Sequence, residues 1–225
     1  MTAEALRVKV FADLEAVGFR PAKSLPDPDL GQSIRPPDEI AARLLALDSV
    51  FTWAAFSEVD VASDRIEDYI DRNGLRDWLA EDERAIVALP RTEAHESHAD
   101  TVGWRLENMW ALAWVLGFDP EPTIEANQIG DDVVQAVIYD FLPGLGGTVD
   151  ALLAKARPRS IEDVIALEYR FYCAHNAVRS AQLGRKTVPK GFHPVVHGGA
   201  IHERRHALSW CLAPGVDWDD VDLST

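Results

Sequence analysis

The residues with the clearest chemical potential are histidines near the C-terminal end of the chain. Four of the seven histidines lie between His193 and His206. His202 and His206 enclose Glu203 in the pentapeptide His-Glu-Arg-Arg-His, which has the spacing of the zinc-hydrolase pattern H-E-x-x-H. Residues four apart share one face of an α-helix, so both imidazoles could bind one Zn²⁺ while Glu203 activates its water. The pattern therefore raises the hypothesis of a metal-dependent hydrolase with zinc as its cofactor.

Two features of the sequence speak against a metal at this pattern. A catalytic zinc needs a third protein ligand, but the chain has no glutamate after Glu203 and no histidine after His206. The cation of Arg205 also flanks the proposed site on the helix, which lowers its affinity for a metal ion. A third ligand would have to come from His175, His193 or His197, of which the last two lie in a predicted loop. We therefore expect no cofactor, and zinc remains the alternative.

Charged residues also occur within helical patterns that are otherwise apolar. A helix predicted from Asp100 to Leu116 is apolar on all sides beyond its first turns, so it should be central. A second, from Ser160 to about Leu183, carries acidic, aromatic and basic side chains on one stripe. A third begins after Gly198-Gly199 and runs to about Leu212. Charges that enter a core must find partners there.

We therefore expect the charged side chains of these three helices to meet. The candidate residues are Arg105, Glu107, Glu168, His175, Arg179, Glu203, Arg204 and His206. In one interpretation they form a closed network of ion pairs and charge-assisted hydrogen bonds that fixes helix register. In the other, the arginines and imidazoles line a cleft that binds a small polar or anionic ligand.

The hydrophobic periodicity is helical almost everywhere, with turn residues between the periodic stretches. It predicts a mainly α, single-domain, multi-helix bundle around the central apolar helix. Residues 1–34 should form an N-terminal helix and a proline-rich connector, and residues 35–225 the helical domain. Besides the three long helices, the patterns predict helices at Leu6–Val17, from Pro37 through Trp53, and at Asp64–Arg72, Glu81–Leu89 and Asp131–Tyr139.

The composition narrows the possible partners. The 225 residues carry 22 basic and 37 acidic side chains, a net charge of −15. Such a surface repels phosphate backbones and anionic lipids, so we expect neither nucleic acid nor a membrane as a partner. Cys173 and Cys211 fall in apolar helical patterns typical of reduced thiols. With no signal peptide or apolar span in view, we expect a cytoplasmic protein.

Three sequence blocks resemble one known family. The first runs from Trp104 to Gly117, the second combines Tyr169-Arg170 with Ala177 to Ala181, and the third runs from His202 to Trp210. The acidic Trp218–Asp222 segment is also similar. The chain resembles domain of unknown function 4272 from about Arg35 onward. The most specific part is the block in which Glu-Arg is followed by Ala-Leu and Trp. The resemblance implies a mostly helical single domain, and it transfers no catalytic residue because the family has no assigned activity.

The sequence thus leaves two kinds of function open. The favoured one is a non-enzymatic interaction or regulatory domain, or a domain that binds a small polar or anionic ligand at the charged cluster. Its partner would be that ligand or another protein. The alternative is the metal-dependent hydrolase that uses His202, Glu203 and His206. Neither interpretation fixes the oligomeric state.

Overall fold

The computed structural model describes residues 1–125 and 127–225, which are helical and contain no strand. The prediction of a mainly α fold is therefore confirmed. The α-helices are α1 (Ala3–Ala16), α2 (Pro37–Ala55), α3 (Ser63–Arg72), α4 (Glu81–Ala88), α5 (Arg91–Val102), α6 (Arg105–Val115), α7 (Asp131–Gln135), α8 (Val149–Lys155), α9 (Ile161–Gln182) and α10 (Gly198–Cys211). Two short 3₁₀ helices, η1 (Leu75–Trp78) and η3 (Trp218–Asp220), and a π-helical turn, η2 (Ala136–Phe141), complete the fold.

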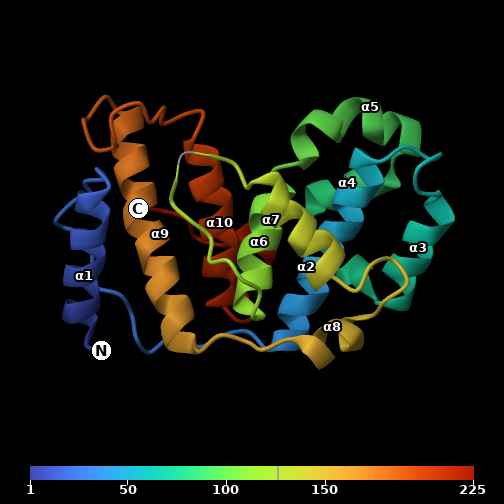
Figure 1. Ribbon diagram of the computed structural model, residues 1–225, viewed down its shortest axis with the longest axis horizontal. Helices are drawn as coiled ribbons and strands as arrows, with labels where there is room; N and C mark the ends of the chain where they lie inside the picture. The colour runs from blue at the N-terminus through green and yellow to red at the C-terminus, as the bar shows by residue number, and fades with distance from the viewer. Residues whose placement is uncertain (126) are drawn as a thin grey trace.

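The helices form a row with α6 and α10 at its centre. On one side of this pair lie α9 and then α1, and on the other lie α2 and the helices α3 to α5 (Figure 1). Every residue of α6 from Glu107 to Val115 is buried, as expected for a helix that is apolar on all sides. The apolar face of α1, formed by Leu6, Val10 and Leu14, belongs to the same core. No helix among the described residues is long and apolar enough to cross a membrane.

Local sequence signals set most helix ends. Ser160 caps α9, since its hydroxyl accepts a hydrogen bond from the Asp163 amide at 3.2 Å. Pro37 occupies the first turn of α2, where its missing N–H costs no helical hydrogen bond. Gly18 follows α1 with φ of 93°, a left-handed conformation that favours glycine. These three ends were predicted from the sequence.

The prediction of one helix from Asp100 to Leu116 is wrong at its start. Asp100 belongs to α5, and the chain turns at Gly103 and Trp104 before α6 begins. The turn lets the Trp104 indole pack against Gly199 at the start of α10, where a methyl group on Gly199 would lie 2.8 Å from the ring. Asp100 therefore lies outside the central helix, and α5 packs separately on α2.

Candidate functional site

His202 and His206 lie on α10 as predicted, but His206 has a structural partner. Nε2 of His206 lies 2.9 Å from the carbonyl oxygen of Trp218, and the two ring centroids are 4.3 Å apart. A carbonyl can only accept, so this nitrogen donates and offers no lone pair to a metal. Burial lowers the pKa of His206. The imidazole thus holds the segment around Trp218 against α10.

The other histidines do not complete a zinc site. The ring centroids of His202 and His206 are 6.4 Å apart, and His175 lies 5.3 Å from His202. The backbone amide of His193 donates a hydrogen bond to Nδ1 of His197 at 2.9 Å, so this ring nitrogen already has a partner. Within residues 1–125 and 127–225, no group of three His, Cys, Asp or Glu side chains could hold a metal ion. The residues present do not fit a catalytic zinc.

The most deeply buried ion pair of the predicted cluster joins α6 to α10. Nε of Arg204 lies 2.7 Å from Oε2 of Glu107, and both side chains are 1% exposed. The remaining Arg204 donors bind the carbonyl oxygens of Thr123 at 2.6 Å and Asn127 at 3.1 Å. The other Glu107 oxygen accepts from the Ile129 amide at 2.8 Å. This pair therefore anchors the loop between α6 and α7 to the central helices.

A second group joins α9 to α10 through Arg205, which was not among the predicted residues. Its Nε lies 3.4 Å from Oε1 of Glu168, and its Nη1 lies 2.8 Å from Nδ1 of His175. Burial, and next the charge of Arg205, lowers the pKa of His175 to about 3. The imidazole is therefore neutral, and Nδ1 accepts from the guanidinium. Arg205 also donates to the carbonyl oxygen of Leu223 at 2.8 Å, which fixes the last residues of the chain.

Arg105 belongs to a third group, on the α4 side of the molecule. Its Nε lies 3.4 Å from Oε1 of Glu83, and it also pairs with Asp82. Arg43 of α2 binds both oxygens of Glu83, at 2.5 and 2.8 Å. Burial opposes ionisation of Glu83, but the two arginines outweigh it and hold its pKa below the usual range. Glu83 was missed because its helix is short and looks exposed in the sequence.

The predicted residues thus form separate groups, and four of them, His175, Arg179, Glu203 and His206, take no part in an ion pair between described residues. Glu203 accepts a hydrogen bond from Nδ2 of Asn108 at 3.1 Å. Arg179 is exposed and donates to Oε1 of Gln182 at 2.7 Å. The expectation that all eight residues converge is therefore wrong. The expectation of buried ion pairs between the long helices is confirmed by Glu107 with Arg204 and by Glu168 with Arg205.

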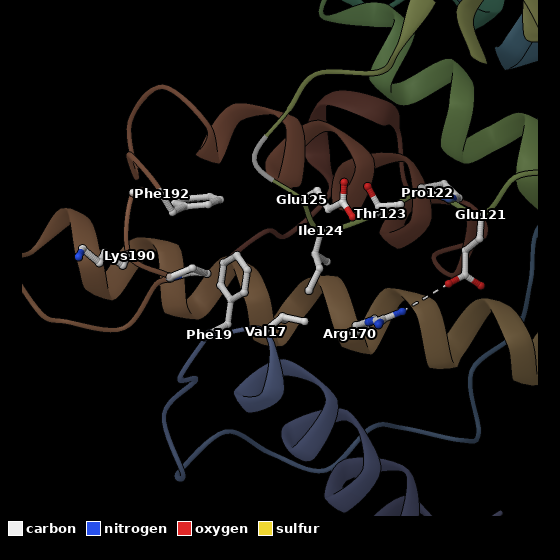
Figure 2. A pocket seen from close by; sticks show the side chains of 12 residues that line it. Val17, Phe19, Glu121, Pro122, Thr123, Ile124, Glu125, Arg170, Lys190 and Phe192 are labelled. Carbon is white, nitrogen blue, oxygen red and sulfur yellow. Dashed lines mark hydrogen bonds and ion pairs between the residues drawn. The ribbon is translucent and has the colours of Figure 1, made fainter. Parts of the chain in front are cut away.

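Several hollows lie near these groups, including one beside Arg105 and Glu203, and two of them show how their chemistry differs. One, of about 540 Å³, is bordered by three predicted residues, His175, Arg179 and His202, and by the last residues of the chain. Its bordering cation Arg179 is exposed, and His175 is neutral. The other hollow, of about 510 Å³, has an apolar lining and an arginine at its edge (Figure 2). The second hollow has the features typical of a small-molecule site.

The apolar pocket forms where three segments meet beside α9. Phe19 comes from the turn after α1, Ile124 from the loop after α6, and Phe192 from the loop before α10. The rings of Phe19 and Phe192 meet edge to face with centroids 5.2 Å apart. Gly18 suits the close packing of this turn on Pro189, because a methyl group on it would lie 3.2 Å from the Pro189 α-carbon. All three apolar side chains are less than 9% exposed.

The buried pair described above fixes one wall of this pocket. Thr123, whose carbonyl receives Arg204, lies in the same wall as Pro122 and Ile124. Because Glu107 and Arg204 belong to the two central helices, they hold this wall in place without contacting the space inside. Their role in the pocket is one of positioning.

Charged side chains of both signs line the same pocket. Nη1 of Arg170 lies 3.4 Å from Oε1 of Glu121, with side chains 35% and 49% exposed (Figure 2). This is the single hydrogen bond of Arg170 to any described residue, and its buried Nε has no described partner. Lys190 and Glu125 are exposed at the rim. A guanidinium has five N–H donors, so Arg170 retains most of its capacity to bind an anion.

Sequence reasoning missed the pocket residues. Phe19, Ile124 and Phe192 lie in proline- and glycine-rich connectors, where no periodicity marks an inward face. Arg170 was part of a block that resembles the family, although no role was assigned to it. The available signal was a large apolar residue inside each connector, which indicates that the connector packs on the core.

Fold and site together define a mainly helical single domain in which a buried Arg–Glu pair holds one wall of an open apolar pocket. Residues 7–221 match the family described as domain of unknown function (DUF4272), and the chain belongs to that family. The resemblance seen in the sequence is thereby confirmed. No curated protein and no solved structure matches the chain significantly. The division expected between residues 34 and 35 stays a prediction.

Proposed function

We propose that this protein is a non-enzymatic binding domain for a small molecule with an apolar body and a charged end. The ligand occupies the pocket in Figure 2, with its body against Phe19, Ile124 and Phe192. The observation that carries the proposal is Arg170, a half-exposed cation with unused donors at the edge of an apolar pocket. Burying an apolar group the size of a leucine side chain contributes about 2 kcal/mol, and the charge fixes its orientation.

The ion pairs predicted from the sequence support this function indirectly. The guanidinium groups of Arg43, Arg204 and Arg205 are filled by carboxylates, carbonyls and an imidazole, so they have little capacity for a ligand. The Glu107–Arg204 pair instead keeps the loop with Thr123 closed against the core. A ligand that contacts this loop is coupled through it to the central helices. Such coupling suits a regulatory or interaction domain, which changes its partners when a small molecule binds.

The hydrolase alternative has no comparable support. Nε2 of His206 donates to the Trp218 carbonyl, and no group of three His, Cys, Asp or Glu side chains among the described residues could hold a metal ion. A net charge of −15 likewise favours neither nucleic acid nor an anionic membrane as the partner.

The proposal can be tested by blocking the pocket from its rim. Thr123 is exposed and lines the pocket, so Thr123→Trp should fill it and leave intact the backbone carbonyl that receives Arg204. Gln128→Trp is the matched control, because Gln128 is exposed in the same loop and does not line the pocket. The probes are phenylalanine, 3-phenylpropanoate and phenethylamine, which share one apolar body and differ in charge.

Ligand-observed NMR measures binding of each probe to the three proteins. We expect at least one probe to bind the parent protein and Gln128→Trp, and none to bind Thr123→Trp. If none of the three probes binds the parent protein, or if Thr123→Trp binds them equally well, the proposed function is wrong.

A further inference from the structure

We propose that the ligand of this pocket is a zwitterionic α-amino acid with a large apolar side chain. This inference rests on the proposed function and adds the chemical class of the ligand. It is carried by the loose Arg170–Glu121 ion pair at the edge of the apolar pocket, which offers a cation and an anion side by side.

The charges in the pocket are balanced in sign. Arg170 and Lys190 are cationic, and Glu121 and Glu125 are anionic. A simple carboxylate would be attracted by Arg170 and repelled by Glu121, whose oxygen lies 3.4 Å from that guanidinium. A simple amine would be attracted by Glu121 and repelled by Arg170. A ligand that carries both charges gains from both residues.

The spacing of an α-amino acid matches the spacing of this pair. Its ammonium and carboxylate are attached to one carbon, so both groups can lie against neighbouring protein charges. The carboxylate then accepts hydrogen bonds from the free donors of Arg170, and the ammonium donates to the carboxylate of Glu121. The four charges alternate in sign, so every close contact is attractive. Both ligand groups thus bind hydrogen-bonding atoms of Arg170 and Glu121 that the ion pair between them does not use.

The charge of the whole chain favours a ligand of this kind. A net charge of −15 repels anions at long range, and the repulsion rises as ionic strength falls. An amino acid at neutral pH has no net charge, so it approaches without this cost. Its dipole still responds to the local pair of charges at the pocket edge.

The apolar lining selects the side chain of the amino acid. Figure 2 shows Ile124 nearer to Arg170 and Phe19 further along α9, with Phe192 above Phe19. A side chain that starts at the ion pair therefore continues onto aromatic and branched surface. Aromatic rings add edge-to-face contacts to simple burial. Aromatic and large aliphatic amino acids should bind, and glycine should not.

Calorimetry with three matched compounds tests the inference. Phenylalanine, 3-phenylpropanoate and phenethylamine share one ring and differ in their ionic groups. We expect phenylalanine to bind at least about tenfold more tightly than either of the others, a difference of about 1.4 kcal/mol. If 3-phenylpropanoate or phenethylamine binds as tightly as phenylalanine, the ligand is not a zwitterion, and the proposed function stands. If none binds, both proposals fail.

Two variants test whether the ligand carboxylate binds Arg170 and the ligand ammonium binds Glu121. Arg170→Gln should weaken phenylalanine binding by about tenfold or more and leave weak phenethylamine binding unchanged or tighter. Glu121→Gln should weaken phenylalanine similarly and leave 3-phenylpropanoate unchanged or tighter. Lys186→Gln is the control, since Lys186 is exposed and lies outside the pocket. Equal affinity of phenylalanine for the parent protein and for both pocket variants would overturn the inference.

Discussion

Breaking the buried Glu107–Arg204 pair should strongly destabilise this domain, and Arg204→Ala measures the loss. The substitution leaves the Glu107 carboxylate 1% exposed, with the Ile129 amide as its remaining described partner. It also removes donors from the Thr123 and Asn127 carbonyls. Removing one partner of a buried ion pair costs about 3–5 kcal/mol. We therefore expect the free energy of unfolding to fall by about that amount.

Arg179→Ala is the matched control for this prediction. Arg179 is exposed on α9 and contacts Gln182, so its loss should change the free energy of unfolding by less than about 0.5 kcal/mol. Guanidinium unfolding followed by tryptophan fluorescence measures both variants. The double variant Glu107→Gln/Arg204→Met should recover part of the loss, because no unpaired charge remains. A loss below about 1 kcal/mol for Arg204→Ala, or an equal loss for Arg179→Ala, would refute the reasoning.

Two further predictions concern buried groups outside the pocket. Burial raises the pKa of Asp48 to about 7, from 3.8 for an exposed carboxyl, against a weaker opposing effect of its hydrogen bond. The native state therefore holds this proton more tightly than the unfolded chain, so stability from this group is full below pH 4 and is lost as pH rises to 7. Asp48→Asn should raise the free energy of unfolding at pH 8 and change it little at pH 3.5, and equal effects at both pH values in denaturant titrations would contradict this. Burial also raises the pKa of the Cys173 thiol to about 12 and that of the Cys211 thiol further. Neither thiol should therefore react with Ellman's reagent at pH 8 until denaturant is added. Rapid labelling of the native protein would be inconsistent with these buried environments.

Much of the fold could be predicted from local signals in the sequence. Ser160, Pro37 and Gly18 mark helix ends because their side chains or backbone preferences act within one turn. The apolar run from Met109 to Val115 identifies the central helix for a similar reason, since its burial needs no knowledge of the partner.

Helix α5 could not be predicted from local signals of this kind. Its sequence from Arg91 to Val102 is polar on most sides, so no apolar stripe marks it. Its stabilising contacts are distant in sequence. Arg91 donates to the carbonyls of Phe56 and Val61, and His95 lies 2.9 Å from the Ala54 carbonyl. Contacts of this kind depend on the tertiary fold and leave no local pattern.

Only part of the site could be predicted, because contacts that depend on the tertiary fold leave no local pattern in the sequence. Helical periodicity showed that charges of α6, α9 and α10 enter the core, and they do. It did not show that Glu168 pairs with Arg205 and that Arg179, about three turns further along α9, reaches solvent. The pairing depends on how far one helix is displaced along another. The pocket itself is built by connectors, whose path is set by the helices they join.

The central claim is that a small ligand occupies the pocket between Phe19, Ile124 and Phe192, and methyl NMR tests it most directly. The protein is labelled at isoleucine methyl groups and titrated with phenylalanine, 3-phenylpropanoate and phenethylamine. We predict a saturable shift of the Ile124 resonance with at least one compound, and no shift for the core residue Ile66, which is 0% exposed. An unchanged Ile124 resonance with all three compounds, or saturable binding seen only elsewhere in the molecule, would contradict the account.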